Sequence, residues 1–166
     1  MMPNFLVLLL AAFVPVLLGF VWYHPKIFGN AWAQAAEMTE EKMKGGKMGL
    51  IFFLSFVLSF FLAMAVNFIV IHQSHMFSTL ANEPGMMEQT GEAWTYFQDF
   101  MTTYGNRFRT FKHGMFHGVL DGIMFATPIL AINAMFERKS FKYVAVNAGY
   151  WILTLGVMGG IICQYA

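Results

Sequence analysis

Four long apolar segments alternate with shorter polar ones along the chain. They extend over residues 5–23, 48–71, 114–136 and 143–165, and only the third contains a formal charge, Asp121. A helix needs about 20 apolar residues to cross the roughly 30 Å hydrocarbon core of a bilayer. The pattern therefore predicts one membrane domain over residues 1–166, an all-α integral membrane four-helix bundle.

The first apolar segment is interpreted as a retained helix and not as a signal peptide. No lysine or arginine precedes it, and no clear small-residue cleavage site follows it. Pro15 lies inside this segment, and Pro128 lies inside the third. Each proline removes a backbone donor and crowds the preceding turn, so we expect a kink in both helices.

The polar connections contain signals for further helices. Thr39, followed by Glu40 and Glu41, predicts the capped start of a helix that runs toward the second span. Residues 73–112 are the only sizeable polar stretch, with a turn at 82–85 and a second predicted cap at Thr90. Apolar residues then recur at helical spacing, at Trp94, Phe97, Met101, Tyr104, Phe108 and Phe111. This spacing predicts an extramembrane amphipathic helix before the third span, which lies in the interface, extends the third span or packs on a partner.

Basic residues gather on one side of the predicted membrane domain. The connections after the first and third spans contain Lys26, Lys42, Lys44, Lys47, Arg138, Lys139 and Lys142, whereas the opposite side contains Arg107, Arg109 and Lys112. Short loops rich in lysine and arginine stay in the cytoplasm. The bias predicts a multi-pass membrane protein with both termini on the side opposite the cytoplasm.

The overall composition supports a membrane protein and excludes some partners. Hydrophobic residues make up 58% of the chain and charged residues 11%, against about 25% charged residues in soluble domains. The net charge of +1 gives no field that would attract nucleic acid, so the lipid bilayer is the expected surrounding. A single cysteine, Cys163, excludes an intramolecular disulfide and a cysteine-based zinc site.

Two sequence elements resemble a known family. The first contains Trp22, Tyr23, Pro25, Phe28, Gly29 and Trp32, and the second contains Phe136, Glu137, Arg138, Asn147, Gly149 and Tyr150. Together with a third helix rich in small residues, they resemble the bacterial membrane-protein family called domain of unknown function 1761. The resemblance covers nearly the whole length and implies a four-helix integral membrane protein, without catalytic residues to carry over. A bacterial family also implies the bacterial inner membrane, and with the lysine bias this places both termini in the periplasm. By itself, the first element is either an interfacial aromatic anchor or a loop that closes over a site.

Glycines recur along the third and fourth spans. Gly114, Gly118 and Gly122 come at every fourth residue, and the fourth span contains Gly149, Gly156 and Gly160. Small residues at such spacing let helix backbones approach closely. We expect these faces to pack against each other or against a neighbouring subunit.

Four histidines fall on one side of the predicted membrane. His72 and His75 end the second helix at a spacing of three, and His113 and His117 begin the third at a spacing of four. Both spacings let two imidazoles face one site, and imidazole binds zinc, copper, nickel and iron. The set therefore indicates a site for a metal or a haem, although no other metal-binding framework accompanies it. The alternative is a set of interfacial histidines bonded to water, headgroups or backbone.

Polar side chains within the spans are candidates for transport or for contacts between helices. Asp121, one turn beyond His117, is expected to coordinate an ion, to orient His117, to relay protons or to form a structural hydrogen bond. Asn67, Asn133 and Asn147 are expected to form hydrogen bonds between helices.

No catalytic motif accompanies these groups, so the sequence gives no support for an enzyme. There is no Walker loop, no GxSxG element and no nucleophile with a paired base. Two function classes remain. The favoured one is a packing or accessory subunit, as a homo-oligomer or within a larger membrane assembly. The alternative is a small transporter or ion-coupled carrier that uses His113, His117 and Asp121.

Overall fold

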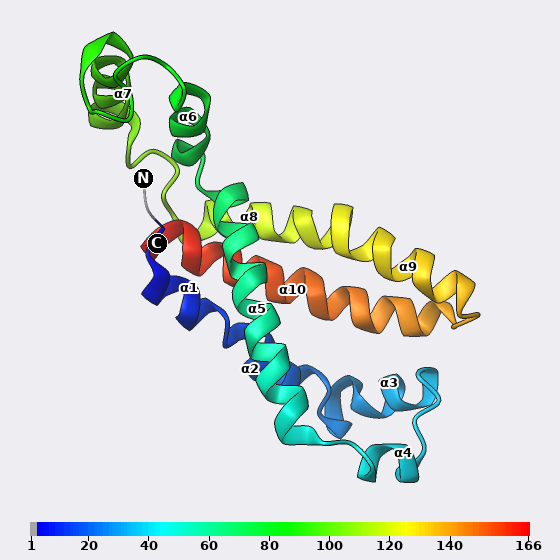
Figure 1. Ribbon diagram of the computed structural model, residues 1–166. Helices are drawn as coiled ribbons and strands as arrows, with labels where there is room; N and C mark the ends of the chain where they lie inside the picture. Colours follow the sequence, from blue (N-terminus) through cyan, green and yellow to red (C-terminus); the bar gives the residue numbers. More distant parts are fainter. Residues whose placement is uncertain (1–2) are drawn as a thin grey trace.

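The computed structural model describes residues 3–166, and this part of the chain is helical, without a β-strand. Four helical segments are long and apolar enough to cross a membrane: Phe5–Trp22, Met48–Val70, Phe111–Phe136 and Phe141–Tyr165. The predicted all-α membrane fold with four spans is therefore confirmed. The third and fourth spans form an antiparallel pair, and the second crosses them (Figure 1).

Both prolines interrupt their spans, as predicted. The first span consists of α1 (Phe5–Ala11) and α2 (Val14–Trp22), and Pro15 lies in the first turn of α2. The third span consists of α8 (Phe111–Asp121), the π-helical turn η2 (Gly122–Ala126) and α9 (Thr127–Phe136), with Pro128 in the first turn of α9. A wider turn before a proline accommodates the missing donor and the bulk of the ring.

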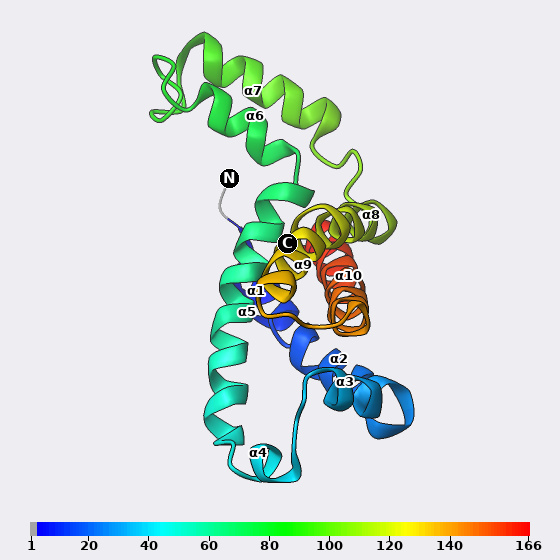
Figure 2. The ribbon, with the colours of Figure 1, turned by 90° about the vertical axis from the view of Figure 1, so that its right-hand side faces the viewer.

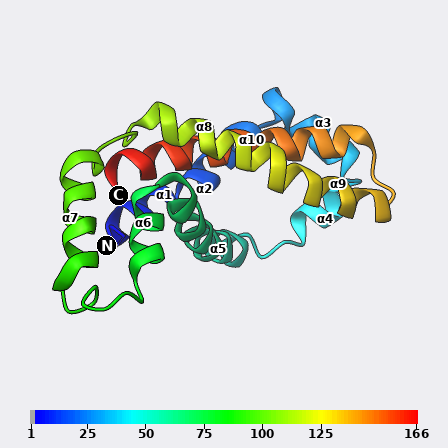
Figure 3. The same cartoon turned by 90° about the horizontal axis from the view of Figure 1, so that it is seen from above.

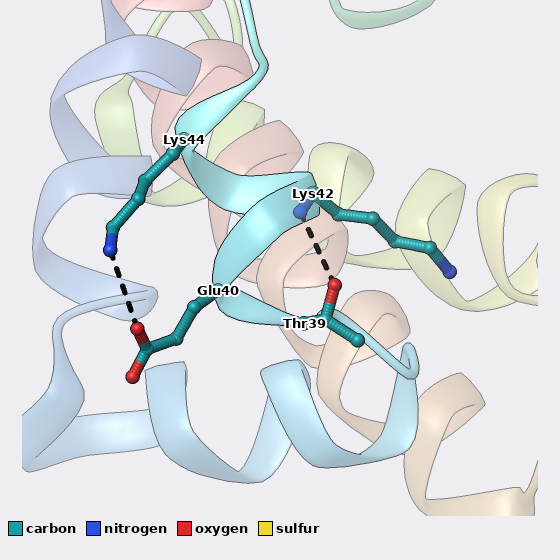
Figure 4. A network of polar contacts seen from close by, with 4 residues as sticks. All are labelled: Thr39, Glu40, Lys42 and Lys44. Atoms are coloured by element: carbon teal, nitrogen blue, oxygen red, sulfur yellow. Dashed lines mark hydrogen bonds and ion pairs between the residues drawn. The ribbon is translucent and has the colours of Figure 1, made fainter.

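The connection between the first and second spans contains three short helical pieces, η1 (Pro25–Gly29), α3 (Asn30–Ala35) and α4 (Glu40–Lys44). The Thr39 hydroxyl accepts a hydrogen bond from the Lys42 backbone at 3.2 Å, so the predicted cap is confirmed (Figure 4). The helix itself is shorter than predicted. It ends at Lys44, because two glycines follow, and α5 (Met48–Val70) starts separately.

The long polar stretch forms α6 (Gln73–Leu80) and α7 (Gly91–Tyr104), which lie side by side beyond the ends of the spans (Figures 2 and 3). The predicted helix after Thr90 is confirmed, but its predicted apolar stripe was too long. Phe108 adopts a left-handed φ of 64°, which separates α7 from α8. The hydroxyls of Thr110 and Ser140 cap α8 and α10 (Phe141–Tyr165), so both spans begin earlier than predicted.

The core lies around α10, the most buried of the four spans. Side chains of α1, α5 and α10 meet there without exposure to solvent, among them Leu8, Ala63, Met158 and Ile162. The outer faces of α5 and α9 are apolar and exposed, as expected for helices that contact lipid. We call the surface with η1, α3 and α4 the lysine side, and the opposite surface with α6 and α7 the histidine side.

The glycines of α8 and α10 lie where the two backbones come closest. A Cβ atom at Gly118 would overlap the Leu155 carbonyl, and one at Gly114 would overlap the Gly159 carbonyl. Gly159 was not foreseen as part of this contact. Gly122, Gly156 and Gly160 face Ile152, Val119 and the Phe111 ring, respectively, within the same helix pair. Gly149 differs, because it faces the Trp22 ring of the first span at 3.0 Å.

Candidate metal site

Three of the predicted histidines converge at the histidine side. His72 is the N-cap residue of α6, two positions after the end of α5, and His113 and His117 lie on α8. The Nε2 atom of His113 lies 2.9 Å from Nε2 of His72 and 3.1 Å from Nε2 of His117. One nitrogen from each ring lies within 4.8 Å of the other two. Side chains 41 residues apart in sequence thus form one cluster.

Local structure places each of these rings. The Thr110 hydroxyl accepts from the His113 backbone at 3.3 Å and fixes the start of α8. His113 and His117 then face the same side, because they are one helical turn apart. Phe108 stacks on the His113 ring with centroids 4.9 Å apart. At the other element, the Gln73 amide donates to the carbonyls of Tyr104 and Arg107, which holds the residue after His72 against the end of α7.

The geometry of the three nitrogens suits a small cation. Zinc bound by imidazole has Zn–N distances of about 2.0–2.1 Å, which in a tetrahedral site places ligand nitrogens about 3.3 Å apart. The two short contacts, 2.9 and 3.1 Å, are slightly below that spacing. Desolvation lowers the pKa of His72, and the nearby rings of His113 and His75 lower it further. A lowered pKa favours the neutral imidazole that binds metals.

The cluster is accessible from one side. His72 is exposed, whereas His113 and His117 are partly buried. A cavity of about 480 Å³ adjoins the cluster, lined by His72, Gln73, Phe100, Tyr104, Arg107, Phe108 and His113. Three protein ligands with an open approach leave a position for water or another ligand on the ion.

Two of the predicted members of this site lie apart from it. The His75 ring centroid is 6.5 Å from that of His72, and His75 does not belong to the group of converging nitrogens. His72 caps the start of α6, whereas His75 lies inside that helix, and the two rings do not point to one site. Asp121 is 8% exposed, and its Oδ2 atom has no hydrogen-bond partner in the described chain. His117 contacts His113 instead, so the predicted bond between Asp121 and His117 is not found in residues 3–166.

The three asparagines of the spans have different surroundings. The Asn147 side chain accepts from the Tyr23 hydroxyl at 2.9 Å and joins the first and fourth spans. Asn67 is buried on α5, and its Oδ1 atom is unpartnered in the described chain. Asn133 is exposed on α9, so it does not join helices within one chain.

The two elements that suggested a family meet each other on the lysine side. The Trp22 indole donates to the Val146 carbonyl at 3.1 Å, and the Tyr23 and Tyr150 rings lie 5.1 Å apart. A Cβ atom at Gly29 would overlap the Tyr23 carbonyl, which explains the glycine at this bend. Sequence analysis did not foresee that the two elements form one contact, because no spacing rule relates residues about 120 positions apart.

Comparison with known proteins identifies a family for this chain. No curated protein and no solved structure matches the chain. A protein family described as "Protein of unknown function (DUF1761)" matches residues 6–163, nearly the whole chain and both aromatic elements. The resemblance seen in the sequence is confirmed, while a bacterial origin stays a prediction. The chain therefore belongs to the DUF1761 family.

Proposed function

We propose that this membrane protein binds a divalent transition metal ion, with Zn²⁺ as the reference case, through His72, His113 and His117. The observation that carries the proposal is the convergence of three imidazole nitrogens from two separate elements. Under the topology predicted from the lysines, this site faces the periplasm. The ion would then reach it without crossing the membrane.

Hydrogen bonding among the rings does not account for the cluster. A neutral imidazole nitrogen carries either one hydrogen or one lone pair, so it makes one good hydrogen bond. Nε2 of His113 has two short contacts, one to each of the other Nε2 atoms. At most one of these contacts is a hydrogen bond. A cation satisfies all three lone pairs at once, which favours a metal over a purely structural cluster.

Equilibrium dialysis of the purified protein in detergent against ZnCl₂ tests this proposal. We expect one bound Zn²⁺ per chain and no stoichiometric binding by His113→Ala. His75→Ala is the matched control, because its ring is at the same surface but outside the cluster. Wild-type protein without bound Zn²⁺, or equal binding by wild type and His113→Ala, would refute the proposal.

Asp121 supports a second candidate function, an ion-coupled carrier. It lies on α8 one turn beyond His117, buried and with an unpartnered carboxylate oxygen in the described chain. A carboxyl group at such a position is costly unless it takes a proton or meets an ion. A carrier predicts that Asp121→Asn binds Zn²⁺ in detergent yet loses Zn²⁺ uptake into proteoliposomes. If the wild type takes up no Zn²⁺ into proteoliposomes, the carrier function is refuted and only the binding proposal is left.

Assembly with other chains stays a prediction. The contacts of Gly114 and Gly118 are made within one chain, so these glycines do not support an interface between subunits. A homo-oligomer or an accessory role in a larger complex would use other surfaces, such as the exposed face of α9. Molecular mass measured in detergent by light scattering distinguishes a monomer from an oligomer.

A further inference from the structure

A second cavity begins at the lysine side, away from the cluster of His72, His113 and His117. It has a volume of about 870 Å³ and lies between α2, α5 and α10, within the size range of ligand sites. The turn after the first span closes one end, through Tyr23, Pro25 and Trp32. Both elements that resemble the family therefore contribute to the wall, the first through these three residues and the second through Tyr150 of the fourth span.

The wall of this cavity offers almost only apolar surface. The Tyr23 hydroxyl donates to Asn147, and the Tyr150 hydroxyl donates to the Pro15 carbonyl at 2.6 Å. Both hydroxyls are therefore satisfied, and the two residues present ring surface to the cavity. The other side chains of the described lining that carry polar atoms are Ser55, Ser59, Trp32, Trp151 and His24. Nδ1 of His24 already accepts from the Lys26 backbone at 3.2 Å. Such a wall suits a hydrocarbon and not a ligand that needs many hydrogen bonds.

The cavity is at least as long as one leaflet of a bilayer is thick. Its lining along α5 extends from Met48 to Leu62. These residues are fourteen helical steps apart, which at 1.5 Å per step is about 21 Å. This is about 70% of the roughly 30 Å hydrocarbon core, so a hydrocarbon chain that enters at the lysine side fits along the cavity. Lining residues Ile51 and Leu58 are 47% and 66% exposed, so the cavity is open sideways toward lipid.

Two lysines are sequence neighbours of lining residues at the lysine-side end of the cavity. Lys26 follows the lining residue Pro25, and Lys47 precedes the lining residue Met48. Both lysines are exposed, and neither belongs to an ion pair of the described chain, in contrast to Lys44 and Lys139. Lys47 also makes no side-chain cap for α5, which leaves backbone N–H groups free at the same place. An anionic headgroup is the natural complement of these charges.

We propose that this cavity binds one acyl chain of an anionic phospholipid from the lysine-side leaflet, with its phosphate near Lys26 and Lys47. The apolar wall, the length of about 21 Å along α5 and the sideways opening select the acyl chain. The two unpaired lysines select the charge of the headgroup. This site is separate from the histidine cluster and does not depend on the metal proposal.

Native mass spectrometry of delipidated protein, reloaded with phosphatidylglycerol or phosphatidylcholine, tests the proposal. We expect one retained phosphatidylglycerol per chain and weaker retention of phosphatidylcholine. A lysine near an anionic lipid contributes roughly a factor of five in affinity. In the double variant Lys26→Gln, Lys47→Gln, the affinity for phosphatidylglycerol should therefore fall by roughly 25-fold, while the affinity for phosphatidylcholine stays unchanged. Lys44→Gln is its control, because Lys44 already pairs with Glu40.

Filling the cavity should remove the lipid altogether. Gly19 lies in the wall, and a Cβ atom there would be 3.7 Å from the Tyr150 hydroxyl, so Gly19→Leu has room to enter the cavity. Ser55→Phe is a second filling variant, and Gly49→Leu, outside the cavity with open space around it, is the control. The proposal would be overturned if both filling variants fold and still retain the lipid, or if the wild type retains none. It would also be overturned if a second copy of the protein occupied the cavity in place of lipid. Retention without headgroup preference would overturn the role of the lysines.

Discussion

Replacing Gly118 with alanine is the sharpest test of how α8 is held against α10. The added Cβ atom would overlap the Leu155 carbonyl and lie 2.9 Å from the Gly156 Cα atom, and both obstacles are backbone. A flexible side chain cannot move aside, so the two helices must separate by about 1 Å. A gap of this size forfeits a quarter to a half of the dispersion energy of the atoms concerned.

The magnitude follows from two opposing effects. Overpacking costs about 1–3 kcal/mol, and a rigid backbone obstacle places this site at the upper end. Alanine favours a helix by about 1 kcal/mol relative to glycine. The expected net loss is about 2 kcal/mol, which for a chain of this size lowers Tm by roughly 4–8 °C.

Thermal unfolding in a mild detergent, followed by circular dichroism, measures this difference. Gly19→Ala is the matched control, because its Cβ atom would make only ordinary contacts at 3.7 and 4.0 Å. We expect the control to be at least as stable as the wild type. If Gly118→Ala proves as stable as Gly19→Ala, the close contact between α8 and α10 does not exist and the reasoning fails.

Two further predictions concern topology and the end of α10. An alkaline phosphatase fused near Glu88 should be active if the lysine side is cytoplasmic, and a cytoplasmic fluorescent reporter that folds at this site would contradict the topology. Arg109→Gln should destabilise the protein by roughly 1–2 kcal/mol, because the guanidinium donates to the Cys163 carbonyl at 2.7 Å and to the Ala166 carbonyl. Arg107→Gln is its control, since that guanidinium only lies over the Tyr104 and Phe108 rings, and equal unfolding temperatures of the two variants would refute the anchoring role.

The sequence predicted the spans and their interruptions well, because apolar length and proline act locally. Pro15 and Pro128 disturb their helices whatever surrounds them. Helix ends were less predictable. The apolar stripe through Phe108 and Phe111 has helical spacing throughout, but the left-handed backbone of Phe108 separates α7 from α8. Hydrophobic spacing alone does not reveal such a bend.

The histidine cluster shows the same limit for a site. The spacing of His113 and His117 correctly placed two rings on one face of α8, since one continuous helix holds both. His72 and His75 have a similar spacing, but His72 caps the start of α6 while His75 lies inside that helix, and only His72 joins the cluster. Asp121 was expected beside His117, yet a side chain one turn away has a partner only if its rotamer and neighbours permit it.

The glycine contact and the proposed metal site are mechanically connected through α8. His113 adjoins Gly114, and a Cβ atom at Gly114 would overlap the Gly159 carbonyl, so α10 fixes the distance of this part of α8 from the core. The partner ligand His72 follows α5, which packs on α10 independently. Metal sites tolerate deviations of about 0.2 Å in ligand distance. A separation of about 1 Å between α8 and α10 would carry His113 and His117 away from His72. The small residues of α8 therefore do more than stabilise the fold, because they set the spacing on which a three-histidine site depends.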